Sequence, residues 1–445
     1  MSKRRAAFLT LGCKVNQYET DAMEEILEKA GYEIVSFKET ADVYIINTCS
    51  VTNMADRKSR QMIHRAKKNN PDAIIVAAGC YVQAAEEELA KKNEADILVG
   101  NNKKKDIAQI LEEYFAAKEP EQEVPVVSEV IDINHTKEYE DLTIHKVNEH
   151  TRAYIKIQDG CNQFCSYCII PYTRGRIRSK NPEEVIEEVK NLAAQGYKEI
   201  VLTGIHLSSY GKDLGTVTLL DVIKRIQQVE DVERIRLGSL EPRIITEEFV
   251  KELVKCDKVC PHFHLSLQSG CDETLKRMNR KYEEALNILR KYYEHPALTT
   301  DVIAGFVGET EEEFEKTRAY LEKINLYEMH IFKYSVREGT RAQKMSGHVP
   351  EQVKTERSEV LLSMAKRHKT AFEEWYVGRK EKVLLEEIVE KNGKKYFQGY
   401  TAHYVKVAVE LTENDTKLEQ NEVIVVDIQG FIDENLLYGK VSIEF

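Results

Sequence analysis

The stretch Gly160-Cys161-Asn162-Gln163-Phe164-Cys165-Ser166-Tyr167-Cys168 places three cysteines in one short segment, with the spacing C-x3-C-x2-C. An apolar run at residues 153–157, which is predicted to form a buried strand, comes shortly before it. Three thiolates at this spacing can hold three corners of a cube-shaped iron–sulfur cluster from one loop, whereas ordinary electron-transfer clusters take four thiolates. One iron would then stay open to another ligand.

Two other interpretations of these cysteines stay open. Zinc is the competing metal, but a closed structural zinc site needs a fourth protein ligand, and the nearest candidates are His150 and His206. The remaining interpretation is a group of reduced, buried thiols that holds no metal.

Alternating strands and helices continue after this motif. Strands are predicted at residues 153–157, 199–202, 234–237, 263–267, 300–303 and 330–334, with helices between them such as 182–194 and 310–323. Asn181 and Pro182 form an N-cap and first-turn pair for the first of these helices. Six strand–helix units predict an open, partial (β/α)6 barrel rather than a full eight-fold one.

The two ends of the chain show different patterns. Residues 8–11, 43–46, 74–78 and 97–99 are predicted strands, and residues 19–29, 54–68, 83–92 and 104–117 are predicted helices, which together favour an open parallel α/β sheet. After a predicted helix at 351–375, residues 383–389, 396–400, 405–411 and 423–428 alternate at period two, and Asn392-Gly393 indicates a hairpin, so the tail is predicted to be a small antiparallel β-barrel. The expected domains are therefore 1–117, 151–375 and 376–445, with a linker at 118–150.

Three further cysteines are dispersed through the first domain. Cys13, Cys49 and Cys80 each come just after a predicted parallel strand. Because parallel strands end at one edge of a sheet, where ligands bind in open α/β folds, we expect these thiols to lie together. The alternative is three separate small core residues.

The composition excludes several classes of protein. The chain has 445 residues, of which 42% are hydrophobic and 31% charged, so it can bury ordinary cores, and global disorder is excluded. No apolar run reaches the roughly 18 residues of a membrane span, and residues 6–11 are too few for a signal-peptide core. We therefore expect a cytoplasmic protein that does not contact membranes, in which nine cysteines indicate metal or redox chemistry rather than disulfides.

The C-x3-C-x2-C motif with an aromatic residue before its last cysteine resembles the signature of radical S-adenosylmethionine enzymes. The resemblance implies that the open iron of a 4Fe-4S cluster binds S-adenosylmethionine and that its cleavage yields a 5′-deoxyadenosyl radical. It also implies cofactor contacts at the ends of the barrel strands, at Thr203, Gly204, Glu241, Ser266, Gln268 and Gly305. Taken singly, such residues more often serve turns and helix caps. Val307 stands where the superfamily pattern has proline, and residues 282–299 are shorter than that pattern; either change could loosen the fifth strand–helix unit.

The segments around the three dispersed cysteines make this resemblance more specific. The strings Leu11-Gly12-Cys13-Lys14-Val15-Asn16-Gln17-Tyr18-Glu19-Thr20, Asn47-Thr48-Cys49-Ser50-Val51-Thr52 and Ala78-Gly79-Cys80-Tyr81 resemble the N-terminal domain of the methylthiotransferases. That family implies a second 4Fe-4S cluster on Cys13, Cys49 and Cys80, and a TRAM-like C-terminal barrel. The first string is most similar to the branch that acts on N6-threonylcarbamoyladenosine beside the anticodon of tRNA.

The resemblance thus implies a tRNA-modifying transferase that adds a methylthio group to C2 of that adenine and needs a sulfur source and a low-potential electron donor. Two alternatives keep the chemistry but change the substrate, to isopentenyladenosine in tRNA or to a ribosomal protein. The non-enzymatic alternative is an iron–sulfur or zinc protein that binds RNA.

Local charge bears on RNA binding. The net charge is −11, and residues 376–445 carry nine Lys and Arg against thirteen Asp and Glu, which disfavours non-specific binding and an RNA-gripping tail. Basic residues nevertheless gather beside the two cysteine sets, and the candidate phosphate contacts are Arg57, Lys58, Arg60, Arg174 and Arg176. Tyr81, Tyr167 and Tyr172 are candidates for stacking a base. The alternative is a solvated helix face and scattered surface charges.

Overall fold

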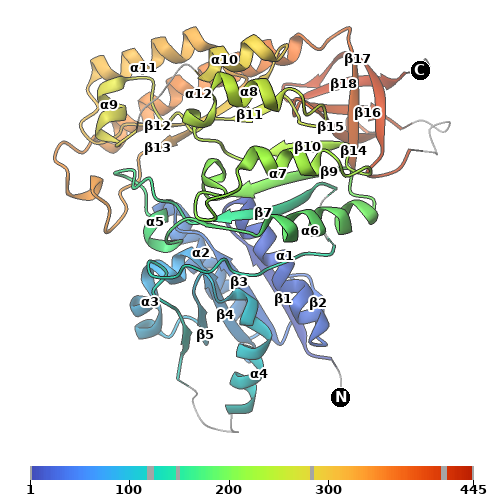
Figure 1. Ribbon diagram of the computed structural model, residues 1–445. Helices are drawn as coiled ribbons and strands as arrows, with labels where there is room; N and C mark the ends of the chain where they lie inside the picture. Colours follow the sequence, from blue (N-terminus) through green and yellow to red (C-terminus); the bar gives the residue numbers. More distant parts are fainter. Residues whose placement is uncertain (1–2, 118–124, 147–150, 281–284, 412–417, 443–445) are drawn as a thin grey trace.

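The computed structural model describes residues 3–117, 125–146, 151–280, 285–411 and 418–442. Figure 1 shows an N-terminal α/β domain in blue and cyan, a central α/β domain from green to orange, and a red β-barrel beside the central domain. Within the described residues no helix is long and apolar enough to cross a membrane.

The N-terminal domain is a six-stranded parallel sheet with the order β2-β1-β3-β4-β5-β6. Its strands are β1 (Arg5–Thr10), β2 (Glu33–Val35), β3 (Val43–Thr48), β4 (Ile74–Gly79), β5 (Ile97–Val99) and β6 (Val127–Glu129). Its helices are α1 (Lys14–Lys29), α2 (Asn53–Asn69), α3 (Cys80–Lys92) and α4 (Ile107–Ala117), the last preceded by a 3-10 turn at Lys104–Asp106. β3 and β4 are buried along their whole length because helices cover both faces of the sheet. The range predicted as a linker thus contributes β6, which pairs with β5.

The central domain has six parallel strands, as predicted. They are β7 (Ala153–Asp159), β9 (Glu199–Gly204), β10 (Arg234–Leu237), β11 (His262–His264), β12 (Ala297–Ala304) and β13 (Glu328–Lys333). They form one sheet ordered β10-β9-β7-β8 and another ordered β11-β12-β13, joined through the bridges Ile235–Val259 and Leu240–Leu265. The sequence did not indicate β8 (Arg178–Ser179), which folds back antiparallel on β7.

Helices cover the outside of this open barrel. They are α6 (Pro182–Ala194), α7 (Leu219–Ile226), α8 (Glu247–Leu253), α9 (Asp272–Arg277), α10 (Ala285–Tyr292), α11 (Glu311–Ile324) and α12 (Glu351–Glu374), with 3-10 turns at Leu207–Ser209, Pro242–Ile244 and Ala342–Lys344. The short helix α5 (Ile170–Thr173) packs instead against α3 of the N-terminal domain. The core beneath the covering helices also takes in Tyr18 and Ala22 of α1. Helix α1 therefore packs between the N-terminal sheet and the barrel (Figure 1), so the two domains share apolar contacts.

The departure at Val307 does not leave the fifth strand–helix unit unpacked. Val307 is fully buried and packs in a small cluster with Phe306, Met278 and Tyr334. Arg277 donates from Nε to the Val307 carbonyl at 3.1 Å and pairs with Glu313 of α11. Of the short 282–299 segment, residues 282–284 lie outside the described residues, and the rest forms α10 and the start of β12.

The C-terminal domain is a closed five-stranded barrel with the order β14-β15-β16-β18-β17. Its strands are β14 (Lys380–Lys391), β15 (Lys394–Thr401), β16 (Lys406–Glu410), β17 (Val423–Asp433) and β18 (Leu436–Val441). The predicted turn at Asn392-Gly393 joins β14 to β15 with positive φ at both residues, as a tight hairpin requires. The structure confirms the predicted small antiparallel barrel, in which every strand pair is antiparallel except β16 and β18, which pair in parallel and close the barrel.

Candidate functional site

Cys13, Cys49 and Cys80 follow β1, β3 and β4, three adjacent strands of the N-terminal sheet. A Cβ placed on Gly12 would lie 2.8 Å from Sγ of Cys49, so the Cys13 loop passes directly against Cys49. Gly12 has a φ of +103°, a conformation that glycine adopts readily and that permits this close approach. Burial, and then the nearby thiols of Cys80 and Cys13, raise the pKa of Cys49 to about 12. The topology therefore brings the three predicted residues to one sheet edge.

The other three cysteines lie in the loop after β7. Cys161 is buried, and Cys165 and Cys168 are half-buried. Burial raises the pKa of Cys161 to about 11, and burial with the neighbouring thiols of Cys165 and Cys161 raises that of Cys168 to about 12. The backbone N–H of Gln163 points at Sγ of Cys161 at 3.5 Å.

Both sets fit an iron–sulfur cluster. Buried thiols with raised pKa values stay protonated at neutral pH, and binding of a metal relieves this cost by replacing the protons. No disulfide competes, since all nine cysteines are free. Within the described residues the three-thiol sets each lack a fourth cysteine, so an iron at each site would keep one position for a non-protein ligand.

Arg280 lies beside the Cys161–Cys168 loop and connects it to two of the predicted cofactor contacts. Its guanidinium lies 3.5 Å from Sγ of Cys165, forms an ion pair of 2.9 Å with Glu241, and donates to the backbone carbonyl of Ser266. Oε1 of Glu241 is buried and accepts no hydrogen bond. Glu241 and Ser266, two of the predicted cofactor contacts, therefore meet beside the thiols, and Oε1 of Glu241 has only a 3.5 Å ion-pair contact with Nε of Arg243.

The other predicted cofactor contacts lie at the same end of the strands. Thr203 and Gly204 end β9, and Gln268 forms a bridge to Val302 of β12. Gln268 has a φ of +74° and Gly305 one of +70°. A side chain on Gly305 would clash with Lys354 of α12, so this glycine is required by packing whether or not it touches a cofactor.

Arg174 was expected to contact phosphate, and the structure contradicts this. The side chain is fully buried, so no RNA can reach it. Its Nε donates to Sγ of Cys80 at 3.2 Å, and its terminal nitrogens pair with Glu19 and donate to Oδ1 of Asn16 at 2.5 Å. These contacts draw the guanidinium inward because buried carboxylates must be paired.

Arg174 belongs to a buried network of charges at the interface of the first two domains. Glu19 of α1 accepts from Lys156 of β7 at 2.8 Å, and Lys156 also pairs with Asp159 at 2.9 Å. The cations hold the pKa of Glu19 well below its usual range. The members are the cations Lys104, Lys156, Arg174 and Arg178 and the carboxylates Glu19, Glu140 and Asp159. Four cations against three carboxylates leave a net positive charge in this network, and Arg174 carries part of it to Cys80.

Arg174 also joins the two thiol sites. It lies six residues after Cys168, and a fully extended chain of that length spans at most about 22 Å. Between them, α5 is held against the N-terminal domain because the side chain of Asn101 donates to the carbonyl of Thr173 at 2.7 Å. The same amide lies 3.6 Å from Sγ of Cys80. The segment that follows the first thiol set therefore packs directly against Cys80 of the second set.

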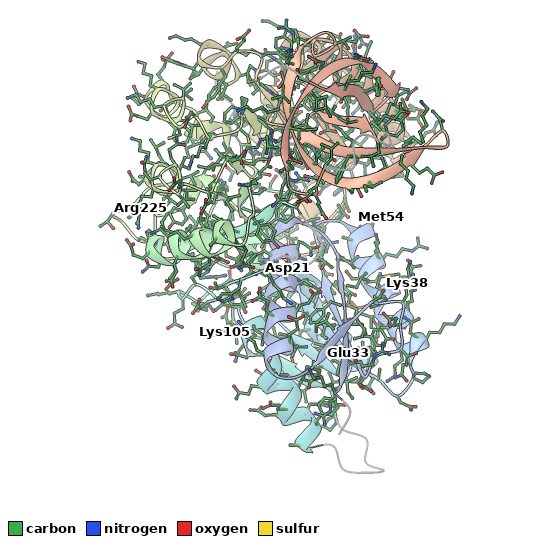
Figure 2. All side chains as sticks on the ribbon, turned by 90° about the vertical axis from the view of Figure 1, so that its right-hand side faces the viewer. Asp21, Glu33, Lys38, Met54, Lys105 and Arg225 are labelled. Atoms are coloured by element: carbon green, nitrogen blue, oxygen red, sulfur yellow. The ribbon has the colours of Figure 1, made fainter. Side chains whose placement is uncertain are left out.

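The remaining basic candidates stand at the surface. Arg57 and Lys58 are exposed and Arg60 is half-buried in the first turns of α2, the end that begins beside Cys49. Figure 2 labels Met54, also exposed, at this end of the N-terminal domain. Arg60 is not free, since it donates to the hydroxyl of Tyr81 at 2.8 Å.

The second exposed group lies in the Cys161–Cys168 loop and in the segment that follows it. Arg176 is exposed and stacks 4.5 Å from the ring of Phe164, which meets Tyr172 edge-on at 5.7 Å. Of the tyrosines expected to stack a base, Tyr172 is exposed, whereas Tyr81 is buried and Tyr167 packs against Phe306.

Sequence patterns missed several residues of this site. Glu19, Asp159 and Arg280 contact the thiols or their neighbours only through tertiary structure. Glu19 stands inside the first quoted string and Asp159 just before the cysteine loop, so position relative to the motifs was the available signal. No motif or neighbouring residue in the sequence indicates that Arg280 belongs to the site.

Comparisons with known proteins agree with this geometry. Residues 5–100 match a family described as "Uncharacterized protein family UPF0004", and residues 155–321 match the "Radical SAM superfamily". The chain is 41% identical over 415 residues to the threonylcarbamoyladenosine tRNA methylthiotransferase MtaB of Bacillus subtilis, covering 92% of this chain and 91% of the relative. It is 36% identical over 404 residues to a tRNA-2-methylthio-N(6)-dimethylallyladenosine synthase of Clostridium botulinum, covering 88% of each.

A solved structure extends the agreement to the fold. The radical S-adenosylmethionine methyltransferase TsrM from Kitasatospora setae superimposes with a TM-score of 0.56 at 14% identity, covering 74% of this chain and 73% of that one. The expected cofactor class, S-adenosylmethionine with iron–sulfur clusters, is thereby supported by the family match and the thiol sites together. The chain belongs to the family of radical S-adenosylmethionine methylthiotransferases, and it is a transferase.

Proposed function

We propose that this enzyme adds a methylthio group to C2 of N6-threonylcarbamoyladenosine beside the anticodon of tRNA. The observation that carries the proposal is the pair of three-thiol sets, each at the carboxyl end of parallel strands, with Arg174 six residues after the first set in contact with Cys80 of the second. Each set leaves room for a non-protein ligand, as a reaction that joins a sulfur to an unactivated carbon requires. The relative with 41% identity is named for this substrate, whereas the relative named for dimethylallyladenosine is 36% identical.

The six cysteines have separate roles in this proposal. Cys161, Cys165 and Cys168 hold the 4Fe-4S cluster that binds S-adenosylmethionine, and Cys13, Cys49 and Cys80 hold a second 4Fe-4S cluster for the sulfur. When bound, these groups supply the one-electron cleavage of the sulfonium and the sulfur that is transferred. The reaction therefore needs an electron donor and a sulfur source from outside the chain.

The side chains around the two thiol sets bind and orient the cofactors and hold the two domains together. Arg280 holds Glu241 beside Cys165, where its carboxylate would help to hold a bound cofactor, and Thr203, Gly204, Ser266, Gln268 and Gly305 would contribute from the ends of the neighbouring strands. The buried charge network around Glu19 fixes the N-terminal sheet edge against the central domain, where Cys49 and Cys80 are buried and Cys13 is exposed.

The tRNA is expected to approach the edge that holds both thiol sets. Arg57 and Lys58 stand there, and Arg176 with Phe164 and Tyr172 offers a cation and two aromatic faces to an unstacked base of the anticodon loop. The acidic C-terminal barrel is not the main phosphate contact in this proposal. The reaction takes place in the cytoplasm, where tRNA is found.

Nucleoside mass analysis tests the proposal. Bulk tRNA from a strain that lacks the gene should contain N6-threonylcarbamoyladenosine without its methylthio derivative, and the reconstituted enzyme should restore the derivative with S-adenosylmethionine and a reductant. A missing methylthio group on dimethylallyladenosine instead, or on a ribosomal protein peptide, would assign the enzyme to another substrate. Unchanged tRNA and ribosomal proteins would refute a methylthiotransferase.

A further inference from the structure

Lys14 is the first residue of α1 and follows Cys13 directly, yet its side chain reaches the central barrel. Its ammonium lies 5.7 Å from the ring of Tyr154 on β7 and 5.9 Å from that of Tyr404 in the C-terminal barrel. Ala153 and Ile155 of β7 pack into the core beneath the helices. Because successive residues of a strand point to opposite faces, Tyr154 between them faces the barrel interior. Lys14 therefore projects from the second thiol set into that interior.

The neighbouring cations already have partners. Arg236 forms two hydrogen bonds, of 2.6 and 3.1 Å, with the carboxylate of Glu199. Arg152 pairs with Glu386 at 2.6 Å. Within the part of the chain that the structure describes, Lys14 forms no ion pair and no hydrogen bond through its ammonium. Lys14 is thus a half-buried cation without a counter-charge beside two arginines that each have one, an arrangement that favours an anionic ligand at Lys14.

Hydrogen-bonding groups lie on the facing strands. His264 of β11 contacts Oγ1 of Thr299 at 3.0 Å and the carboxylate of Asp301 at 3.3 Å, and His330 of β13 stacks on it with ring centres 5.8 Å apart. Asp301 and His330 are register partners on β12 and β13, and His330 is exposed. Burial, and then the charges of Arg236, Lys14 and His264, lower the pKa of His262, which begins β11 two residues before His264.

We propose that Lys14 binds the carboxylate of the threonyl group on the target adenine, with His264 and His330 as hydrogen-bonding groups of the same pocket. The assignment rests on the proposed function and deepens it. A threonylcarbamoyl group carries a carboxylate, a hydroxyl and a urea, whereas a dimethylallyl group carries none of these. Because Lys14 is adjacent to Cys13, a carboxylate held there keeps the adenine ring beside the second thiol set.

Binding of short RNA hairpins tests this. Three synthetic anticodon stem-loops would differ only at the target adenine, which carries threonylcarbamoyl, the same group with its carboxylate converted to a neutral amide, or dimethylallyl. We expect the anaerobically reconstituted wild-type enzyme to bind the first about 10- to 100-fold more tightly than the second, the effect of one charge-assisted hydrogen bond. Equal binding of the first two would overturn the assignment, and this comparison needs no variant.

Variants then assign the effect to Lys14. K14Q should lose the preference for the carboxylate while K14R keeps most of it. K29Q is the matched control, since it removes the same charge from the exposed end of the same helix and should retain the preference. Iron content and visible absorption would show that K14Q keeps both clusters. Full preference in K14Q would overturn the role of Lys14.

The two proposals fail in different ways. If the wild-type enzyme forms a methylthio product on the threonylcarbamoyl stem-loop but ignores its carboxylate, this inference alone is wrong. If it forms product only on the dimethylallyl stem-loop, the proposed substrate is wrong as well.

Discussion

The guanidinium of Arg174 donates from Nε to Sγ of Cys80 at 3.2 Å, although Arg174 belongs to the central domain and Cys80 to the N-terminal sheet. The same side chain pairs with Glu19, which Lys156 of the barrel also contacts. A thiol of the second set is therefore held by a residue that follows the first set in sequence. Domain packing and the second thiol site depend on the same contacts.

Replacement of Arg174 should damage both. R174M leaves Glu19 buried with less compensating charge and removes the cation beside Cys80, so we expect a loss of about 3–5 kcal/mol in unfolding free energy. We also expect the reconstituted protein to lose the iron of the second site. Iron analysis and denaturant titration would measure the two effects.

Two variants control for this prediction. R174K keeps the charge but not the bidentate geometry, so it should retain more iron than R174M. R225M removes an arginine of similar size from an exposed pair with Glu183 (Arg225 is labelled in Figure 2), and it should leave stability and iron unchanged. A full iron complement in R174M would contradict the proposed link between the two sites.

Iron content should separate the two thiol sets. With one 4Fe-4S cluster in each, the wild-type protein should hold about eight iron atoms, and C165A and C80A about four each. C165A should abolish formation of 5′-deoxyadenosine, whereas C80A should retain it but form no methylthio product. About four irons in the wild-type protein would remove the second cluster from the proposal.

A cysteine outside the two three-thiol sets offers the control. Cys256 is buried outside both sites, next to the carbonyl of Glu252 at 3.9 Å. C256A should therefore keep about eight irons and full activity. Loss of iron in C256A would show that iron content reports folding rather than ligation.

The edge of the N-terminal sheet shows what the sequence could predict. Cys13, Cys49 and Cys80 each followed a recognisable strand, and parallel strands must end at one edge, so their meeting followed from topology. The six strands of the barrel were found for a similar reason, since each is a short apolar run between helices. β6 was missed because it has only three residues, and β18 was missed because it contains a glycine. Neither strand shows a clear alternation of apolar and polar residues.

Arg174 and Arg280 show where prediction from sequence stops. Counting charges along the chain cannot tell whether an arginine faces water or a carboxylate 155 residues away, as Glu19 is from Arg174. Arg280 reaches Cys165 across 115 residues through the fold of the barrel alone. The parallel pairing of β16 with β18 is likewise a consequence of barrel closure, not of either strand.

Salt dependence should reveal which side chains bind phosphate. If Arg57 and Lys58 bind the tRNA backbone, the variant R57Q/K58Q should bind tRNA more weakly, and its plot of log affinity against log salt should be shallower by about 1 for each phosphate that is no longer neutralised. Equilibrium binding at several salt concentrations measures the slope. An unchanged slope would exclude α2 from the interface.

Helix α2 supplies the matched control. Lys67 and Lys68 are exposed at its other end, about 15 Å further along the helix axis and away from the edge that holds Cys49. K67Q/K68Q removes the same charge as R57Q/K58Q and should leave the slope unchanged. An equal reduction of the slope in both variants would indicate non-specific attraction rather than direct binding at the start of α2.

Glu373 of α12 should make stability depend on pH. Burial raises its pKa to about 7, although Lys369 lowers it and Tyr327 donates a hydrogen bond of 3.2 Å to it. Because the pKa is higher in the folded than in the unfolded protein, the folded state loses stability as pH rises from about 4.5 to about 7, and above pH 7 the loss is constant. With partial solvation the loss should be on the order of 1–2 kcal/mol.

E373Q removes this titration while keeping the shape of the side chain. Its unfolding free energy should exceed that of the wild type most above pH 7, and the difference should shrink steadily as pH falls toward 5. Denaturant titrations at several pH values measure the difference directly. A difference that grows toward acid pH would mean that the carboxylate is stabilised in its charged form, because Lys369 would then outweigh burial at the junction of α12 and the C-terminal barrel.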